Sequence, residues 1–300
     1  MGEKVSLTSL LNFRDVGSAT GNTAALPAGR LYRAFDIDEA SKEDRKYLRE
    51  SLSITSLINL WGPPESFVRR KDDASQFQEQ YPDRLRSFQV LDFNVHEINL
   101  RSPAYMANFW KSIPWKDKAK GLGWALIGQT NNGRQVLDSA LQRDLEWLKD
   151  VADILTLSKP QIKAVFEALA QKDVGPVLIY GPHTTLIFCL LLSLLGVAED
   201  KISHEYRLTE QNSDTLLEYS NARRKDVGLA ARSSWDHPPS FVPDVLDYIN
   251  AEYHGVDVYL SSIGLTHNQL ESVKKNLQGT GSSNEKLVDV EEQYAASSYA

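Results

Sequence analysis

Cysteine is almost absent from this sequence: Cys189 is the only one in 300 residues, so no disulfide can form within the chain. That scarcity is typical of proteins in a reducing compartment, and a cytoplasmic location is expected. Long apolar runs are missing as well. The most apolar segment, Thr185 to Val197, has 13 residues, whereas a membrane-spanning helix needs roughly 20. The segment therefore predicts a buried helix, and no membrane partner is expected.

Positive charge is in deficit, with 33 Lys and Arg against 40 Asp and Glu, which gives a net charge of −7. Such a chain has no general attraction to nucleic acid or to anionic membranes.

Metal-ligand spacings are also absent, because His96 and His183 have no cysteine partner. Gly133 and its neighbours form no nucleotide-binding pattern. We therefore expect neither a metal nor an organic cofactor, and a small organic molecule as the partner.

Short apolar runs bounded by glycine and proline predict buried strands at 54–60 and 176–180, with a weaker candidate at 86–95. Segments whose apolar residues have helical spacing lie between and after these runs. A helix before the strand at 176–180 and another after it indicate an α/β layer fold. The predicted helices are 41–52, 158–172, 185–195, 241–253 and 266–277.

Two segments stand apart from this α/β pattern. Residues 102–150 hold four of the six tryptophans and predict either a lid over a pocket or a helical hairpin on the core. Residues 281–300 are small, polar and acidic, which is typical of a disordered tail. The expected organisation is one domain over residues 1–280, followed by that tail.

Several motifs in the chain resemble those of one family. Asn12-Phe13-Arg14-Asp15 and Gly29-Arg30-Leu31-Tyr32-Arg33 lie near the start, and PVLIY with LLLSLLGV lies later. Together they are similar to the atypical tyrosine phosphatases of bacteria and fungi. The resemblance implies a central, mostly parallel sheet flanked by helices, with a helical lid insertion.

The chemistry of that family lies in a phosphate loop of the pattern H-C-x-x-G-K-D-R, between strand and helix. There a thiolate attacks phosphorus, while backbone N–H groups and an arginine hold the oxyanions. Here the interval is Tyr180-Gly181-Pro182-His183-Thr184-Thr185, which has no Cys, Arg, Lys or Asp and is about four residues shorter than the family's loop. The chain is therefore expected to be a degenerate member that is not a working phosphatase.

Four residues are the candidate catalytic groups. His183 lies at the turn after a central strand, where α/β folds place their ligand crevice. Its alternative is a side chain that fills the gap left by a short loop. Arg33 and Asp36 are expected to approach the same crevice, or else to form an ion pair that supports it. Tyr180 could donate a hydrogen bond into the pocket, or be a core residue.

The candidate substrate-binding residues include two that stand where the family has charge. Asn59 and Trp61 take the places of its Asp and Arg, which favours a flatter, less charged ligand or reflects repacking. Arg14 and Asp15 could instead form a buried structural pair. The complete binding set is Trp61, Asn59, Thr184, Arg14, Asp15, His96, Trp110 and Trp124.

Three functions remain open. The first is a repurposed enzyme that performs cofactor-free acid–base chemistry, such as isomerisation, elimination or cyclisation, plausibly in a biosynthetic pathway. The second is a pseudophosphatase that binds or scaffolds without catalysis. The third is a hydrolase with Thr184 or Thr185 as its nucleophile. A deep polar cavity would favour the first, and an exposed patch would favour the second.

Overall fold

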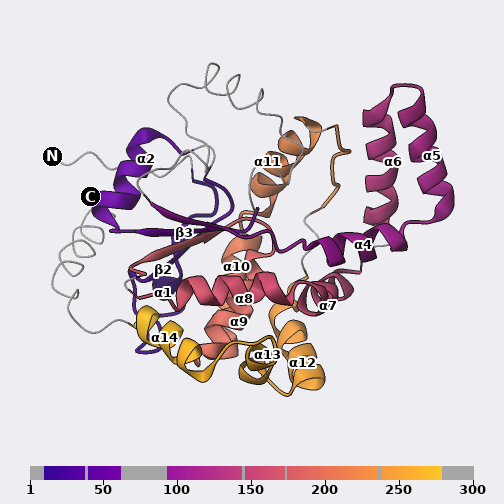
Figure 1. Ribbon diagram of the computed structural model, residues 1–300. Coiled ribbons are helices and arrows are strands. Elements are labelled where there is room, and N and C mark those ends of the chain that lie inside the picture. The colour runs from indigo at the N-terminus through magenta and orange to yellow at the C-terminus, as the bar shows by residue number, and fades with distance from the viewer. Residues whose placement is uncertain are drawn as a thin grey trace.

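The computed structural model describes residues 10–37, 40–61, 93–143, 146–172, 174–226, 228–234 and 238–278 (Figure 1). Within these residues, five strands form one sheet in the order β1-β2-β5-β3-β4. Only β1 runs antiparallel to its neighbour. The predicted α/β fold with a mostly parallel sheet is confirmed. The strands are β1 Arg14–Asp15, β2 Leu31–Ala34, β3 Ser56–Asn59, β4 Asn94–Glu97 and β5 Val177–Tyr180.

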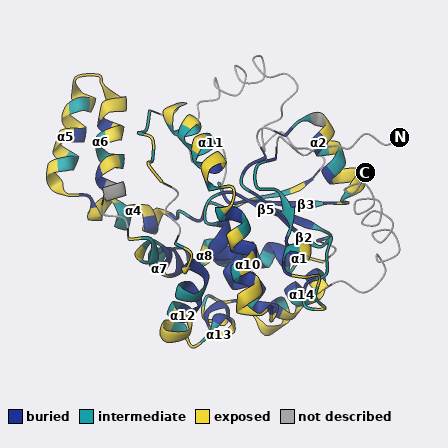
Figure 2. Ribbon diagram, turned by 180° about the vertical axis from the view of Figure 1, so that it is seen from behind, coloured by how far each residue is buried: buried dark blue, intermediate teal, exposed yellow. Residues whose placement is uncertain are grey.

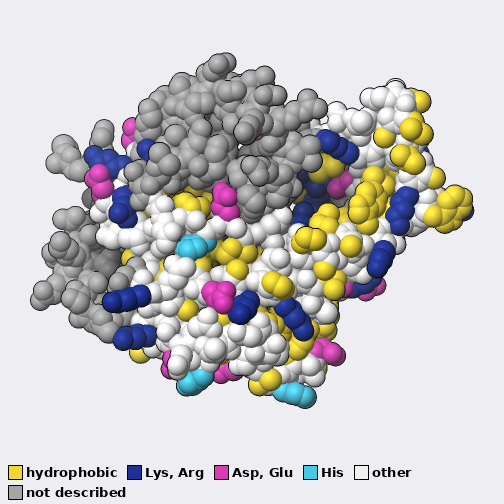
Figure 3. Space-filling model, viewed as in Figure 1, with side chains coloured by type: hydrophobic (Ala, Val, Ile, Leu, Met, Phe, Trp, Pro, Cys, Tyr) yellow, Lys and Arg dark blue, Asp and Glu magenta, His cyan; other side chains and the backbone are white. Residues whose placement is uncertain are grey.

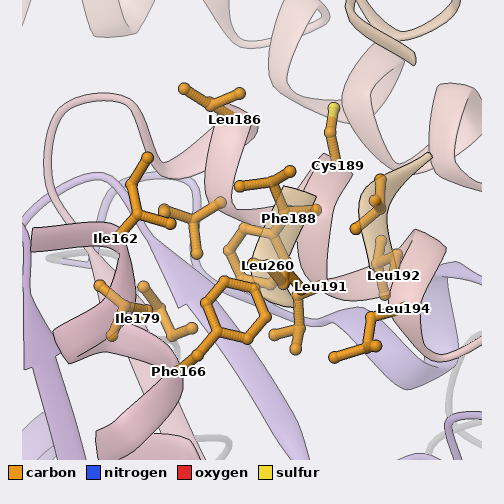
Figure 4. Close-up of a cluster of buried hydrophobic side chains, with 14 of the residues drawn as sticks. Ile162, Phe166, Ile179, Leu186, Phe188, Cys189, Leu191, Leu192, Leu194 and Leu260 are labelled. Carbon is orange, nitrogen blue, oxygen red and sulfur yellow. The ribbon is translucent and has the colours of Figure 1, made fainter. Parts of the chain in front are cut away.

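The central strand β5 is covered on both faces, as a parallel strand with a continuous apolar sequence requires. Its alternate residues divide between two clusters. Val177 and Ile179 belong to the larger core, whereas Leu178 and Tyr180 belong to the smaller one. Helix α9, Thr184–Leu194, is buried along nearly its whole length in the larger core (Figures 2 and 4). The apolar segment that is too short for a membrane span is thus the central helix of the core.

The larger core is built from helices that follow β4 in the chain. Figure 1 shows them gathered on one side of the sheet, with α2 on the other side. Besides α9 they include α7 Trp147–Leu157, α8 Lys159–Leu169, α10 Glu199–Glu210, α12 Phe241–Tyr253, α13 Val256–Ser262 and α14 His267–Gln278. None of the described helices is long and apolar enough to cross a membrane.

The helix predicted at 41–52 divides into two parts. Ser41 caps α2, Lys42–Lys46, in a reciprocal capping box with Asp44, as its sequence indicates. The chain then widens into a π-type turn, Tyr47–Ser51, before Ser53 takes a left-handed conformation with φ 53°. The cap and the acidic first turn indicated where the helix starts, but they carry no signal for the change in winding.

The region 102–150 forms helices α4 Pro103–Ser112, α5 Trp115–Leu126 and α6 Thr130–Arg143, and the start of α7 Trp147–Leu157. Helices α5 and α6 form an antiparallel hairpin that projects from the body of the molecule (Figure 1). Most of its surface is exposed (Figure 2). One contact to the body is the ion pair between Asp138 of α6 and Arg224 of α11, Ser213–Asp226.

The predicted tail at 281–300 and most of the weak strand candidate at 86–95 lie outside the described residues. The part of that candidate within them, Phe93 to Val95, leads into the first half of β4.

Candidate functional site

The parallel strands β2, β3, β4 and β5 all end at one edge of the sheet. Their carboxyl ends deliver Asp36, Trp61, Arg101 and His183 toward this edge. In open α/β sheets ligands bind in the crevice outside the carboxyl ends of the strands. The structure therefore brings side chains from four separate segments to the place where a ligand site is expected.

The turn between β5 and α9 is tight, with Gly181, Pro182 and His183 alone linking strand to helix. Gly181 has a φ of 116°, and a Cβ there would lie 2.9 Å from the backbone nitrogen of Trp61. Only glycine fits this close approach. His183 has a φ of 59°, an uncommon conformation for a residue with a side chain. Non-glycine residues held in this region are often found at functional sites.

Two side chains, Arg101 and Asp150, contact the imidazole of His183, and Tyr105 bonds one of them. Nε of Arg101 donates to Nε2 of His183 at 3.4 Å, which requires Nε2 to be the unprotonated nitrogen. The proton of a neutral imidazole is then on Nδ1, which faces Oδ2 of Asp150 at 3.8 Å. The Tyr105 hydroxyl donates to Oδ1 of Asp150. The side chains of His183 and Asp150 are 14% and 16% exposed, so both are accessible but largely enclosed.

Each neighbour of His183 is held by its own local structure. Asn99 accepts a hydrogen bond from the backbone N–H of Arg101 at 2.9 Å, and Leu100 between them is fully buried. Asp150 lies on α7, one turn from its start. Burial, with the Asp150 carboxylate nearby, raises the pKa of Tyr105. Tyr105 therefore keeps its proton and remains a donor to Asp150 over the ordinary pH range.

A second group at the same edge is aromatic and cationic. Phe35 and Tyr219 meet edge to face at 6.0 Å, as do Phe35 and Trp61 at 6.3 Å. The guanidinium of Arg223 lies 5.6 Å from the centre of the Trp61 ring and forms an ion pair with the buried Asp36. Cation–π contact of this kind holds a ring in place. The result is a fixed aromatic wall beside the β5–α9 turn.

The candidates Asn59 and Asp36 bond residues of this aromatic and cationic group. Oδ1 of Asn59 accepts from the backbone N–H of Trp61 at 2.9 Å, so the amide shapes the turn that carries the indole. Asp36 is 3% exposed, and Arg223 compensates its charge. The structure thus places these two side chains as supports of Trp61 and Arg223.

Arg33 is bound to a different partner from the one expected. Its guanidinium forms a two-point ion pair with Glu205 of α10, at 2.8 and 3.1 Å, and reaches Thr185 at 3.3 Å. It is 3% exposed and lies over the ring of Phe188. The arginine against His183 is Arg101, and Arg33 belongs to a buried cluster with Arg14 and Glu205.

Arg14 and Asp15 do not form the mutual pair that the sequence suggested. Arg14 bonds Glu205 at 2.9 Å and Thr209 at 2.7 Å. Asp15 caps helix α1, Val16–Ala19, and also accepts from the N–H of Gly29 at 2.6 Å. Successive residues of a strand point to opposite faces, so neighbours in sequence seldom pair.

The remaining candidates are dispersed over the fold. Tyr180 is fully buried in the smaller core, and the Thr184 hydroxyl donates to the carbonyl of Gly181. His96 lies on β4 beside Ile58, and burial lowers its pKa. Trp110 is half exposed on α4, and Trp124 packs on Gly133 of α6. Among the contacts of the described residues, none joins either tryptophan to His183: Trp110 belongs to α4, and Trp124 belongs to the α5–α6 hairpin.

Cys189 is fully buried in α9, and burial raises the pKa of its thiol. A buried, protonated thiol is neither a nucleophile nor a metal ligand. Among the described residues, no cluster of His, Cys, Asp and Glu has the composition of a metal site.

The sequence did not single out the residues that surround His183. Arg101 and Tyr105 lie just after a weak strand candidate, and Asp150 lies in the region with no readable pattern. Arg101 had one usable signal, a cation four residues after the end of β4 and directly before the helix-capping Ser102. Asp150 had none, because its proximity to His183 depends on how α7 packs.

Comparison with known proteins agrees with the fold and with a relation to tyrosine phosphatases. A model of a family described as "Tyrosine phosphatase family" matches residues 5–279, which is nearly the whole chain. A protein of Nostoc commune named "Tyrosine-protein phosphatase" is 28% identical over 240 residues, covering 73% of this chain and 76% of that protein.

Proposed function

The chain belongs to the tyrosine phosphatase family, and we propose that it has exchanged phosphate-ester hydrolysis for cofactor-free acid–base chemistry on a small organic substrate. The observation that carries this proposal is the position of His183 between Arg101 and Asp150 at the carboxyl edge of the sheet. The match over residues 5–279 also supports a single phosphatase-like domain over 1–280.

The short β5–α9 turn supports the loss of phosphatase activity. The family's chemistry needs a thiolate, an arginine and a cradle of backbone N–H groups in this turn. Gly181, Pro182 and His183 supply neither of those side chains, and Pro182 lacks an N–H group. The only cysteine of the chain, Cys189, is buried on α9, beyond the turn (Figure 4).

The arrangement suits a histidine base. Nε2 of His183 would take a proton from the substrate once the substrate displaces the 3.4 Å contact to Arg101. The guanidinium would then bind the oxygen on which negative charge develops. Asp150 faces the other ring nitrogen, where it fixes the tautomer and stabilises the imidazolium. Return of the proton to another carbon completes an isomerisation. In an elimination the proton goes to the group that departs, and in a cyclisation it goes to the atom left negative when the ring closes.

The aromatic wall indicates the shape of the substrate. Trp61, Phe35 and Tyr219 present rings beside the turn, and Asn59 is neutral. Ligand pockets combine apolar and aromatic walls with a few placed polar groups. A planar, conjugated molecule with an enolisable carbonyl would meet both the rings and the His183–Arg101 pair.

A comparison of two histidine variants tests the proposal. His183 and His254 both have left-handed backbones, with φ 59° and 64°, so His→Asn is tolerated by the backbone at each. The purified chain would be incubated with a panel of enolisable ketones and β-keto acids in D2O, and deuterium uptake followed by mass spectrometry. We expect uptake that His183→Asn reduces at least 100-fold, in line with the loss of a general base, and that His254→Asn leaves unchanged.

The proposal also predicts that the chain has no phosphatase activity. The chain should not hydrolyse p-nitrophenyl phosphate above the buffer rate, and Cys189→Ser should leave deuterium uptake unchanged. Phosphate release that disappears in Cys189→Ser would refute the proposal. Equal deuterium uptake by the wild type and His183→Asn would remove the histidine from the mechanism.

The scaffold function is the second candidate, because the hairpin exposes a set of large apolar side chains. Surfaces of this kind mark sites of protein interaction.

The threonine hydrolase has less support. The Thr184 hydroxyl donates to a backbone carbonyl, and Thr185 is held by Arg33. Neither contact supplies a base.

A further inference from the structure

Helix α5 has two different faces. Its inner face packs closely on α6 through glycine: a Cβ on Gly121 would lie 3.0 Å from the Leu137 side chain, and one on Gly133 would lie 2.6 Å from the carbonyl oxygen of Gly121. Trp124 packs against Gly133 on the same side. The hairpin is therefore held together without the other side of α5.

The outer face of α5 carries an apolar stripe. Trp115, Ala119, Leu122 and Leu126 follow one another at intervals of four, three and four residues, which is the spacing of a helix–helix seam. Trp115, Leu122 and Leu126 are 73%, 62% and 79% exposed. Of the seven large apolar side chains that are exposed in the described chain, six lie between Met106 and Ile127.

Lysines border this stripe. Lys116 and Lys118 lie on its two sides, at the positions that carry charged residues in paired helices. A shallow groove of about 410 Å³ lies beside the stripe and is lined by Trp110, Lys111, Lys118 and Leu122. Figure 3 shows apolar side chains along the hairpin with Lys and Arg side chains beside them.

The charge of this face is opposite to that of the whole chain. Between residues 103 and 128 there are four lysines and one aspartate, so four minus one gives a local charge of +3 in a chain whose net charge is −7. The expectation that the chain has no attraction to anions depended on the total charge. The distribution of charge concentrates that attraction on the hairpin.

We propose that the outer face of α5 binds an acidic amphipathic helix of a partner protein. Leucines of that helix would pack along the stripe, one large side chain would enter the groove, and glutamates or aspartates would meet Lys116 and Lys118. The spacing of the stripe matches that of a helix–helix seam, and the lysines beside it match acidic flanks.

A second copy of the chain fits this face less well. In a two-fold pairing of α5 with itself, Lys116 and Lys118 would face the same lysines, and like charges there oppose association. A bilayer could meet the lysines, but it offers no side chain at helical spacing for the groove. The proposal does not depend on the acid–base function, because no residue of the His183 site takes part in it.

The test uses a labelled three-heptad peptide with leucine at the seam positions and glutamate on both flanks. Repulsion between the glutamates hinders association of the peptide with further copies of itself. Fluorescence anisotropy with the full chain should give saturable binding. Leu122→Ser should weaken binding at least tenfold, and Lys116→Glu with Lys118→Glu should weaken it about tenfold, since reversing two exposed pairs amounts to roughly one power of ten. Circular dichroism would show that the variants remain folded.

A charge-reversed peptide with lysine on the flanks serves as the control, and it should bind the doubly reversed variant better than the wild type. Equal binding of both peptides, or none, would overturn the proposal. So would concentration-dependent dimers in sedimentation that Leu122→Ser abolishes. Binding to anionic phosphatidylserine vesicles that exceeds peptide binding and needs Leu122 would assign the face to a lipid surface instead.

Discussion

The buried cluster of Arg14, Arg33 and Glu205 gives the sharpest stability prediction. Glu205 is 1% exposed and faces two guanidiniums, with N–O distances of 2.7 and 2.8 Å. Burial, followed by the nearby Arg33 cation, lowers the pKa of Arg14 to about 10, and Glu205 opposes that decrease. The cluster already holds two positive charges against one negative charge.

Glu205→Ala would leave both cations buried without a counter-charge. Removing one partner of a buried ion pair costs about 3–5 kcal/mol. That is a large part of the roughly 5–15 kcal/mol that stabilises a typical domain. The free energy of unfolding would be measured by urea denaturation, where the midpoint should fall while the slope stays the same. Glu199→Ala is the control, since Glu199 is exposed in the first turn of the same helix and should change stability by less than about 1 kcal/mol.

The double variant Glu205→Ala with Arg33→Met separates charge from packing. If an uncompensated cation causes the loss, removing Arg33 should restore part of the stability of Glu205→Ala, a coupling that a double-mutant cycle measures directly. A loss below about 1 kcal/mol for Glu205→Ala, or a double variant less stable than the single one, would refute the electrostatic argument.

Four further outcomes are expected. Asp15→Ala removes a helix cap that also holds Gly29, so thermal melting should show a loss of about 1–2 kcal/mol, and Asp15→Asn should lose less. Gly181→Ala places a Cβ 2.9 Å from the Trp61 backbone at φ 116°, so we expect a loss of about 1–3 kcal/mol, whereas the exposed Gly123→Ala should stabilise slightly. Cys189 should resist iodoacetamide in the native chain and react after unfolding, because burial raises its pKa; rapid native labelling would contradict this. Burial lowers the pKa of His96, so the unfolded chain takes up the proton first as pH falls through about 6.5; stability should decrease there, and His96→Leu should flatten that part of the pH profile.

The sequence predicted the strands β3 and β5 and the central helix because these depend on local pattern, whereas β1 and β2 were not predicted as strands. The apolar run at 176–180 and the helix predicted at 185–195 became β5 and α9 within one residue at each end. Helix α12 was predicted with its observed bounds. Helices α10 and α11 were missed, since both are largely polar and their few apolar residues do not form a broad stripe.

Residues of the candidate site were placed from sequence only where position along the chain was enough. His183 follows a strand directly, and so do Trp61 and Asp36, which makes their edge of the sheet readable from sequence. Their partners come from helices whose packing the sequence does not reveal: Asp150 from α7, Tyr219 and Arg223 from α11, and Glu205 from α10. The assignment of Arg33 to His183 failed for the same reason, because Glu205 was not recognised as its counter-charge.

The strand order has a consequence for the chain as it leaves the ribosome. Strands β2 and β3 lie on either side of β5, so neither can complete its pairing until residues 177–180 have been synthesised. Until then β3 can pair only with β4, and β2 only with β1. Unpaired strand edges are prone to aggregation, and strand pairs that are distant in sequence form slowly. A truncation that ends before β5 should therefore be insoluble or bound by chaperones, whereas one that ends after α14 should fold.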